Sequence, residues 1–450
     1  MPMTVKSISW SKLCVGFLIY MCAMLTITSR FIWPLFNLPH IVNQVLIVLE
    51  YLPFAGFALW KLVIDIKSKK LDIFSKFYYA FGGYYIVLSG VRLVLGMEVK
   101  DNLYIACVLF GTLALYFVLY TKKAQNNQQS LFNAILLFSV VLVIYWVLYL
   151  IVIRPIVWSS PINDIAYGTC CVLLIPILTM GLSNCQKLTI KKMVILATLT
   201  SMLIICTTLG SRVIFFAILF EILALLAINI KNARILKEFL GTVCLSVLVV
   251  TLLFVMNVGQ VRYSLYREIQ FLNTFDETTT SQSPPVQETP PVQETPPEPV
   301  VTPSEEELLA MEKVASSDDM RGVLFQMGLE EVKKNFWFGT GEVYFRYDTE
   351  TQEYRVPAHN FILVTLNCFG FVGVCFLLAL ALAMLAQLKI FRWKHLSVQL
   401  TFLLVLAPYL GISMVQASFY DLLIMPLMFV IASIFTMETC SEENKKLTDE

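Results

Sequence analysis

The sequence predicts an all-α, polytopic integral membrane protein with about twelve transmembrane helices and one large external loop that contains short helices. Of its 450 residues, 58% are hydrophobic and 14% are charged, whereas soluble domains average about 45–50% and about 25%. This composition excludes an ordinary soluble enzyme. The 33 Lys and Arg residues nearly balance the 32 Asp and Glu residues, so the net charge does not indicate a nucleic-acid partner.

Twelve apolar runs are long enough to cross a bilayer, which requires about 20 mostly apolar residues. They cover about 13–29, 41–64, 74–95, 103–120, 131–153, 162–182, 190–209, 213–230, 239–256, 361–387, 397–415 and 419–437. A few residues separate the last two runs, so a tight hairpin or a re-entrant pair is an alternative there. The chain therefore divides into helices 1–9 (1–256), an external loop (257–360), and helices 10–12 with a cytoplasmic tail (361–450).

Basic residues in the short loops predict the orientation of the chain. Alternate loops and termini hold nineteen Lys and Arg residues, and the loops between them hold five, namely Arg30, Arg92, Lys100, Arg154 and Arg212. Because basic loops remain cytoplasmic, we expect both termini inside and residues 257–360 outside. The first run lacks a small-residue cleavage site and is expected to be retained. The eleven cysteines indicate no disulfide framework and no zinc spacing.

The external loop differs in composition from the rest of the chain. A repeated Pro-Pro-Val-Gln-Glu-Thr begins a Pro-rich spacer at 284–303, which is expected to be extended. Ser304 and Glu307 form a capping box for a helix that ends near residue 314, and a second helix is predicted from about Asp318 to Asn335. Gly339-Thr-Gly341 then predicts a turn; two glycines alone are weak evidence for phosphate binding.

Two arginines are candidate anion ligands in this loop and at its border. Residues 257–360 contain eighteen Asp and Glu against eight Lys and Arg, so an anionic substrate would need a few well-placed cations. Arg212 begins a span, and Arg321 lies beside an apolar stripe of the second helix. The rigid guanidinium fork is suited to a diphosphate. The alternative is that Arg212 marks the membrane interface and that Arg321 snorkels.

His359 and Asn360 directly precede the tenth span. Asn360 is suited to cap that helix, whose beginning carries partial positive charge. Histidine exchanges protons near neutral pH, and the chain has only three, which makes His359 a candidate catalytic residue. The alternative is an ordinary residue of the membrane interface.

These motifs resemble a known family. Gly210-Ser-Arg212, Arg321, Phe338-Gly-Thr-Gly341, Pro357-Ala-His-Asn360 and Gly370-Phe-Val-Gly373 together are similar to the signature of the O-antigen ligase and O-antigen (Wzy-type) polymerase superfamily of membrane glycosyltransferases. The resemblance covers about residues 205–380. It implies transfer of an oligosaccharide from undecaprenyl diphosphate to an acceptor glycan, or to a lipid-linked glycan, on the external face of the bacterial cytoplasmic membrane.

The resemblance also implies roles for individual residues. Arg212 and Arg321 would bind the diphosphate, and His359 would orient or activate the acceptor hydroxyl. Ser211 and Asn360 belong to the same motifs and are expected at the substrate. Arg154 and Asp164, on a short external loop, are further candidates for substrate binding, with interface anchoring as the alternative.

Several other interpretations remain. Asp348-Thr-Glu350 lacks supporting metal ligands, so we expect a solvated loop, no metal and no cofactor. Glu221, in the middle of a span, is expected to be a structural residue or a protonated carboxyl. A flippase for lipid-linked oligosaccharide is the main alternative function, although the single long loop makes the two halves unlike. A peptidoglycan transferase would require an essential carboxylate. We expect polymerisation rather than ligation.

Overall fold

The structure, a computed structural model, is helical in the described parts of eleven of the twelve predicted spans. Ten of these helices carry labels. These helices are α3 (His40–Ser68), α4 (Ile73–Val94), α5 (Lys100–Thr121), α6 (Gln128–Leu148), α7 (Asp164–Ser183), α8 (Ile190–Thr208), α9 (Arg212–Ile228), α10 (Ala233–Met256), α14 (Phe361–Leu388) and α15 (Leu396–Gln416). The structure describes residues 16, 40–68, 71–95, 100–121, 128–148, 164–183, 185, 187–209, 211–256, 318–342, 344–348, 353–357, 360–388, 396–416 and 424–432. The last range is also helical, whereas the first predicted span lies outside the described residues apart from residue 16.

The chain is a polytopic helical membrane protein. Within the described ranges, four helices are long and apolar enough to cross a membrane by length and composition, at Leu131–Leu148, Ile190–Thr208, Ala233–Met256 and Phe361–Ala386. Several shorter apolar helices accompany them. The number of twelve spans and the cytoplasmic placement of both termini stay predictions.

The segment that the sequence predicts to be external contains the second predicted helix and a hairpin that the sequence analysis missed. The helix is α13 (Asp318–Lys334), and strands β1 (Tyr344–Asp348) and β2 (Glu353–Pro357) pair antiparallel. The all-α prediction is therefore wrong for this hairpin, and Asp348 ends a strand. Aromatic and β-branched residues alternate along both strands and face each other, as in the Phe345–Val356 pair, which favours pairing. The Pro-rich spacer and the helix expected after Ser304 lie outside the described residues.

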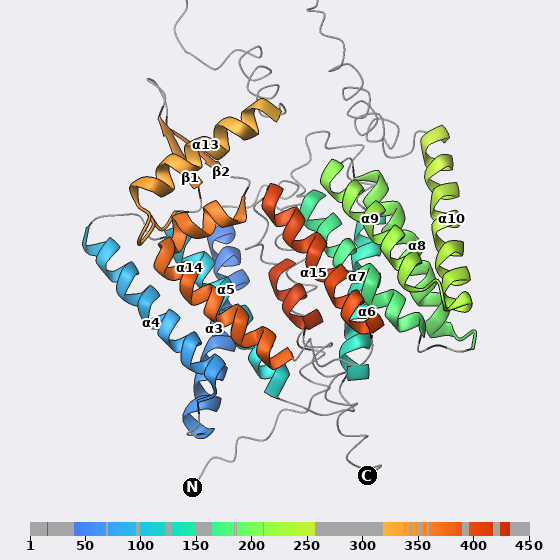
Figure 1. Cartoon of the computed structure of the whole chain (residues 1–450), viewed down its shortest axis with the longest axis horizontal. Coiled ribbons are helices and arrows are strands. Elements are labelled where there is room, and N and C mark those ends of the chain that lie inside the picture. Colours follow the sequence, from blue (N-terminus) through green and yellow to red (C-terminus); the bar gives the residue numbers. More distant parts are fainter. Residues whose placement is uncertain are drawn as a thin grey trace, which may run out of the picture.

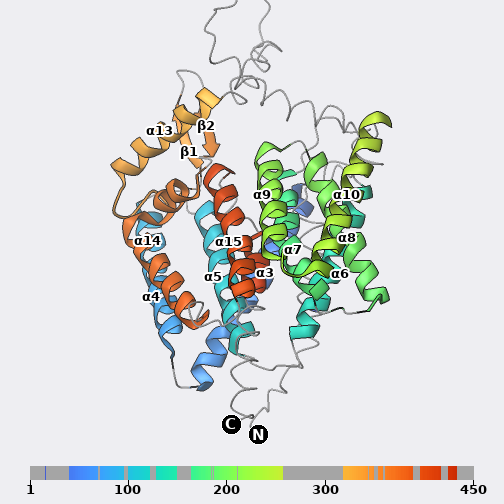
Figure 2. The ribbon, with the colours of Figure 1, turned by 45° about the vertical axis from the view of Figure 1, so that its right-hand side comes forward.

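The helices form one bundle, with α13 and the β1–β2 hairpin at one end (Figure 1). Helices α4 and α14 form one flank, α8 and α10 form the other, and α15 lies between α14 and α9 in both views (Figures 1 and 2). Small residues allow close packing between helices. At Gly111 of α5, for example, a Cβ atom would lie 2.6 Å from the Cα atom of Phe54 on α3. Aromatic rings fill the α4–α14 contact, where the centroids of Phe81 and Phe369 are 5.5 Å apart.

A buried ion pair connects α3 with α4 at the end of the bundle away from the external segment. Lys61 Nζ lies 2.5 Å from Asp65 Oδ2 and 2.8 Å from Ser75 Oγ. Tyr79 donates its hydroxyl hydrogen to the same carboxylate oxygen over 2.9 Å. The exposed fractions of Lys61 and Asp65 are 0% and 5%. A charge in this apolar interior is tolerated because its partners compensate for the lost hydration.

We predict that Lys61→Met destabilises the protein by about 3 kcal/mol, since it leaves the Asp65 carboxylate buried without its cation. The double variant Lys61→Met/Asp65→Asn should recover much of this loss, because the amide oxygen can still accept from Tyr79. Thermal unfolding in detergent measures the effect, with the exposed Lys67→Met as control. A double variant as unstable as the single one would contradict this explanation.

Candidate active site

The beginning of α14 is capped as the sequence predicts. Asn360 Oδ1 accepts hydrogen bonds from the backbone N–H groups of Ile362 and Leu363, over 3.0 and 3.1 Å. These bonds satisfy two of the unpaired amides at the helix start. His359, the preceding residue, lies outside the described residues, but Asn360 fixes the helix start that follows it.

Nine residues after its first residue, α14 is interrupted at Gly370. Here φ is 67° and ψ is −179°, a conformation that residues with a side chain rarely adopt. A Cβ atom at this position would also clash with the backbone of Trp337 and Phe338. The break releases backbone N–H and C=O groups about 14 Å along the helix from its start. Such groups are tolerated at membrane depth only where other protein groups pair with them.

The segment 336–342, which we call the 336–342 loop, supplies most of those partners. The N–H groups of Phe371 and Val372 donate to the carbonyls of Phe336 and Trp337 over 2.8 and 3.2 Å. In the other direction, the N–H groups of Thr340 and Gly341 donate to Asn367 O over 2.7 and 3.0 Å. The loop that follows α13 is therefore paired with the broken turn of α14.

The predicted turn at Gly339-Thr-Gly341 is present, with φ of 67° and 87° at the two glycines. All three amides of this turn are already paired: Thr340 and Gly341 donate to Asn367 O, and Gly339 N–H donates to Asn335 O over 2.7 Å. The side chain of Asn367 adds a bond from its Nδ2 to Glu342 O of 2.8 Å. The turn thus holds α13 against α14 and presents no free amide to a phosphate.

Arg92 of α4 completes this structure, and sequence reasoning missed its role. Its Nη2 lies 2.6, 3.0 and 3.1 Å from the carbonyl oxygens of Phe338, Gly339 and Cys368. Nearby, Tyr84 donates to Phe369 O over 2.7 Å. Arg92 was counted as a basic residue of a short loop, but it lies inside α4 and is 2% exposed. The sequence does contain a signal for this role, because Arg92 lies within an apolar run and an ionisable residue in such a run indicates a specific partner.

The other predicted site residues lie at the same end of the bundle or outside the described residues. Ser211 is the N-cap of α9 and is half-buried, and its side chain makes no capping hydrogen bond. Arg212 begins α9 and Arg321 belongs to the first turns of α13, but the described part of the structure does not include their side chains. Arg154 lies outside it entirely. The beginnings of α9, α13 and α14 share one end of the bundle, and α15 lies between α9 and α14 (Figures 1 and 2).

Glu221 lies in the interior of the bundle. Its exposed fraction is 0%, and in the part of the chain that the structure describes neither carboxyl oxygen has a hydrogen-bond partner. Its complete burial agrees with the expectation of a structural residue or a protonated carboxyl. No group of three or more His, Cys, Asp and Glu side chains among the described residues could hold a metal ion.

Comparison with protein families gives one match. Residues 197–378 match the family model described as O-antigen ligase. The match covers 182 of the 450 residues, and it confirms the resemblance seen in the motifs. The family implies a glycosyltransferase-like ligase or polymerase activity, with lipid-linked glycan and glycan acceptor as substrates. None of the curated proteins compared with the chain matches it.

We predict that Arg92→Met loosens the 336–342 loop, because three buried carbonyls lose their donor at a cost of about 3 kcal/mol in total. Hydrogen–deuterium exchange should show faster exchange at the amides of Thr340 and Gly341. Lys76→Met removes an exposed cation from the same helix and should leave exchange unchanged. Unaltered exchange in the Arg92 variant would show that Arg92 does not hold the loop.

We also predict that Gly370→Ala destabilises the protein by at least about 2 kcal/mol and lowers its activity. Alanine disfavours the positive φ at this position, and its methyl group would clash with the backbone of the 336–342 loop. Gly90→Ala is the matched control, because a Cβ atom at Gly90 meets nothing within 4 Å. Thermal unfolding and glycan-transfer assays measure both variants. Equal stability of the two would refute the requirement for glycine at position 370.

Proposed function

We propose that this protein is a glycosyltransferase that moves an oligosaccharide from undecaprenyl diphosphate to an acceptor glycan on the external face of the bacterial cytoplasmic membrane. The observation that carries the proposal is the match of residues 197–378 to the O-antigen ligase model. The matched range includes Ser211, Arg212, Arg321, His359 and Asn360, which are all the proposed site residues except Arg154. In this proposal both termini are cytoplasmic and residues 257–360 are external.

The chemistry of the external face favours such a donor. Nucleotide sugars are confined to the cytoplasm, so an external transferase requires a glycan that arrives attached to a lipid. In the proposed step, the acceptor hydroxyl oxygen forms a bond to the anomeric carbon of the donor glycan. The bond from that carbon to the diphosphate oxygen breaks, and its electron pair leaves with undecaprenyl diphosphate. The hydroxyl proton passes to His359, a transfer worth a factor of about 10² to 10⁴.

Arg212 and Arg321 would stabilise the charge that grows on the leaving diphosphate, and this role requires no metal ion. The packing of α13 supports a defined position for Arg321, because the 336–342 loop ties the end of that helix to the broken turn of α14. Asn360, the neighbour of His359 in the chain, caps the beginning of α14. Ser211 and Arg154 would contact the substrate.

An exposed aromatic group beside this region supports the placement at the membrane interface. Phe336, Trp337, Phe338 and Phe371 are 39%, 60%, 56% and 40% exposed, and the rings of Phe336 and Phe371 stack with centroids 5.1 Å apart. Aromatic side chains gather where the apolar core of a bilayer meets water. A site at this depth suits a donor whose diphosphate lies at the surface and whose chain lies in lipid.

We predict that His359→Ala, Arg212→Ala and Arg321→Ala each abolish transfer, by a factor of 100 or more, while expression and membrane insertion are retained. The variants would be expressed in a strain that lacks the gene, and the surface glycan would be analysed on gels. Lys334→Ala, which removes an exposed external cation, is the control and should be fully active.

The same gels distinguish a polymerase from a ligase and so identify the class of acceptor. Single repeat units on the anchor indicate a lost polymerase, which is the outcome we expect, whereas long chains on the carrier lipid indicate a lost ligase. Full activity in any of the three variants would reject that residue from the site. Accumulation of the donor on the cytoplasmic side would instead indicate a flippase.

A further inference from the structure

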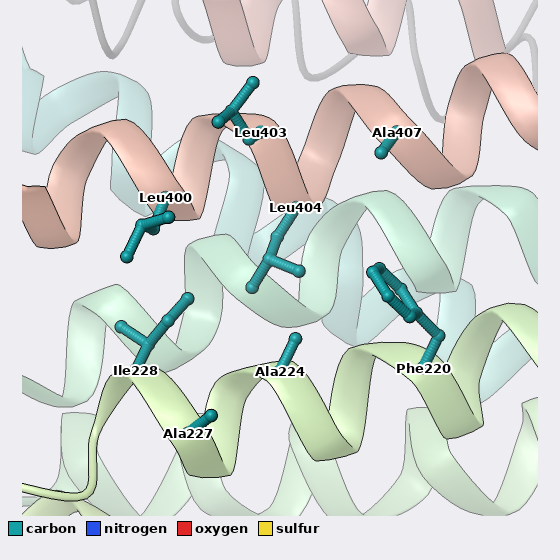
Figure 3. A pocket seen from close by; sticks show the side chains of 8 residues that line it. All are labelled: Phe220, Ala224, Ala227, Ile228, Leu400, Leu403, Leu404 and Ala407. Atoms are coloured by element: carbon teal, nitrogen blue, oxygen red, sulfur yellow. The ribbon is translucent and has the colours of Figure 1, made fainter.

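A groove lies between α9 and α15, away from the residues discussed so far. Eight residues line it, all of them apolar: Phe220, Ala224, Ala227, Ile228, Leu400, Leu403, Leu404 and Ala407 (Figure 3). Its volume is about 430 Å³. The three alanines leave room where the helices meet, and the larger side chains form the walls. A site of this composition can bind only a hydrocarbon group.

The position of the groove along α9 gives its depth. Phe220 and Ile228 follow Ser211, the N-cap of α9, by nine and seventeen residues, which corresponds to about 14 and 26 Å along the helix. Half of the hydrocarbon core of a bilayer is about 15 Å thick. Measured from the end of α9 that holds Arg212, the groove therefore begins near the middle of the membrane and extends into the opposite leaflet.

An exposed apolar face connects the groove with the beginning of α9. Phe216, Leu219 and Leu223 follow Arg212 at positions i+4, i+7 and i+11, so they share its side of the helix. They are 44%, 44% and 60% exposed, and Phe220 beside them is 55% exposed and lines the groove. A hydrocarbon chain that starts at Arg212 can therefore follow α9 to the groove without crossing a polar surface.

We propose that this groove binds the distal part of the donor's polyprenyl chain and so selects donors by chain length. This inference rests on the proposed function, in which the diphosphate is bound at Arg212. The acyl chains of a phospholipid in the same leaflet end near the middle of the membrane, whereas an undecaprenyl chain is several times longer. Only a long chain anchored at the beginning of α9 reaches both Phe220 and Ile228 from that side.

The test compares two diphosphates that have the same head group and different chains. The full-length protein in lipid nanodiscs would be titrated with undecaprenyl diphosphate and with the much shorter geranylgeranyl diphosphate, at equal mole fractions in the bilayer. We expect the long chain to bind about tenfold more tightly, because it buries additional apolar surface. Ala224→Phe, which fills the groove, should remove this preference and leave the affinity for the short chain unchanged.

Ala80→Phe is the matched control, since Ala80 is an exposed alanine of α4 that lines neither the groove nor the face of α9 leading to it; it should keep the preference. Ala407→Leu fills the groove from the opposite wall and tests the same point independently. Retained binding of geranylgeranyl diphosphate shows that each variant is folded.

Each outcome bears on one of the two proposals. Equal affinity of the wild-type protein for both diphosphates, or a preference that survives in both groove variants, would overturn the chain-length inference. The groove variants could instead lose co-purified phospholipid while their affinities for both diphosphates stay unchanged. That result would also overturn the chain-length inference, and it would assign the groove to phospholipid. Failure of both diphosphates to bind the wild-type protein would instead reject the proposed donor.

Discussion

The pairing of the broken turn in α14 is the constraint on which the candidate site depends. A helix inside a bilayer cannot leave backbone N–H and C=O groups unpaired, because no water is available to replace the lost hydrogen bonds. At Gly370 the helix loses several of these bonds, and groups from two other elements replace them. The 336–342 loop pairs with the exposed backbone, and Arg92 of α4 binds three carbonyls at the centre.

This constraint joins α13 and the 336–342 loop to the membrane helices. A segment rich in acidic residues would otherwise have little reason to pack against an apolar bundle. Because the 336–342 loop is both the continuation of α13 and the partner of α14, the two helices form one unit with α4. The beginning of α14, capped by Asn360, and α13 are thus parts of one hydrogen-bonded unit. The cost of leaving the loop unpaired keeps this arrangement stable.

The other part of the proposed site depends on a different element. Helix α15 lies between α14 and α9, so the beginning of α9 and the broken turn of α14 lie on opposite sides of α15 (Figure 1). One face of α9 is apolar and exposed, and it ends at an apolar groove against α15. This arrangement suits a substrate with two unlike parts, because a charged head and a hydrocarbon chain require different surroundings.

The sequence by itself determined the membrane class, the position of eleven helices, the cap at Asn360, the helix α13 and the turn at Gly339. These features depend on apolar length and on local backbone chemistry, which neighbouring residues decide. Only the tertiary structure decided what the glycine turn and Arg92 do, because their partners are more than 20 residues away in the chain. The α9–α15 groove likewise depends on which segments meet, and a single sequence does not contain that information. The hairpin is different, because its strands are neighbours in the chain and their aromatic and β-branched residues were a signal that the sequence analysis missed.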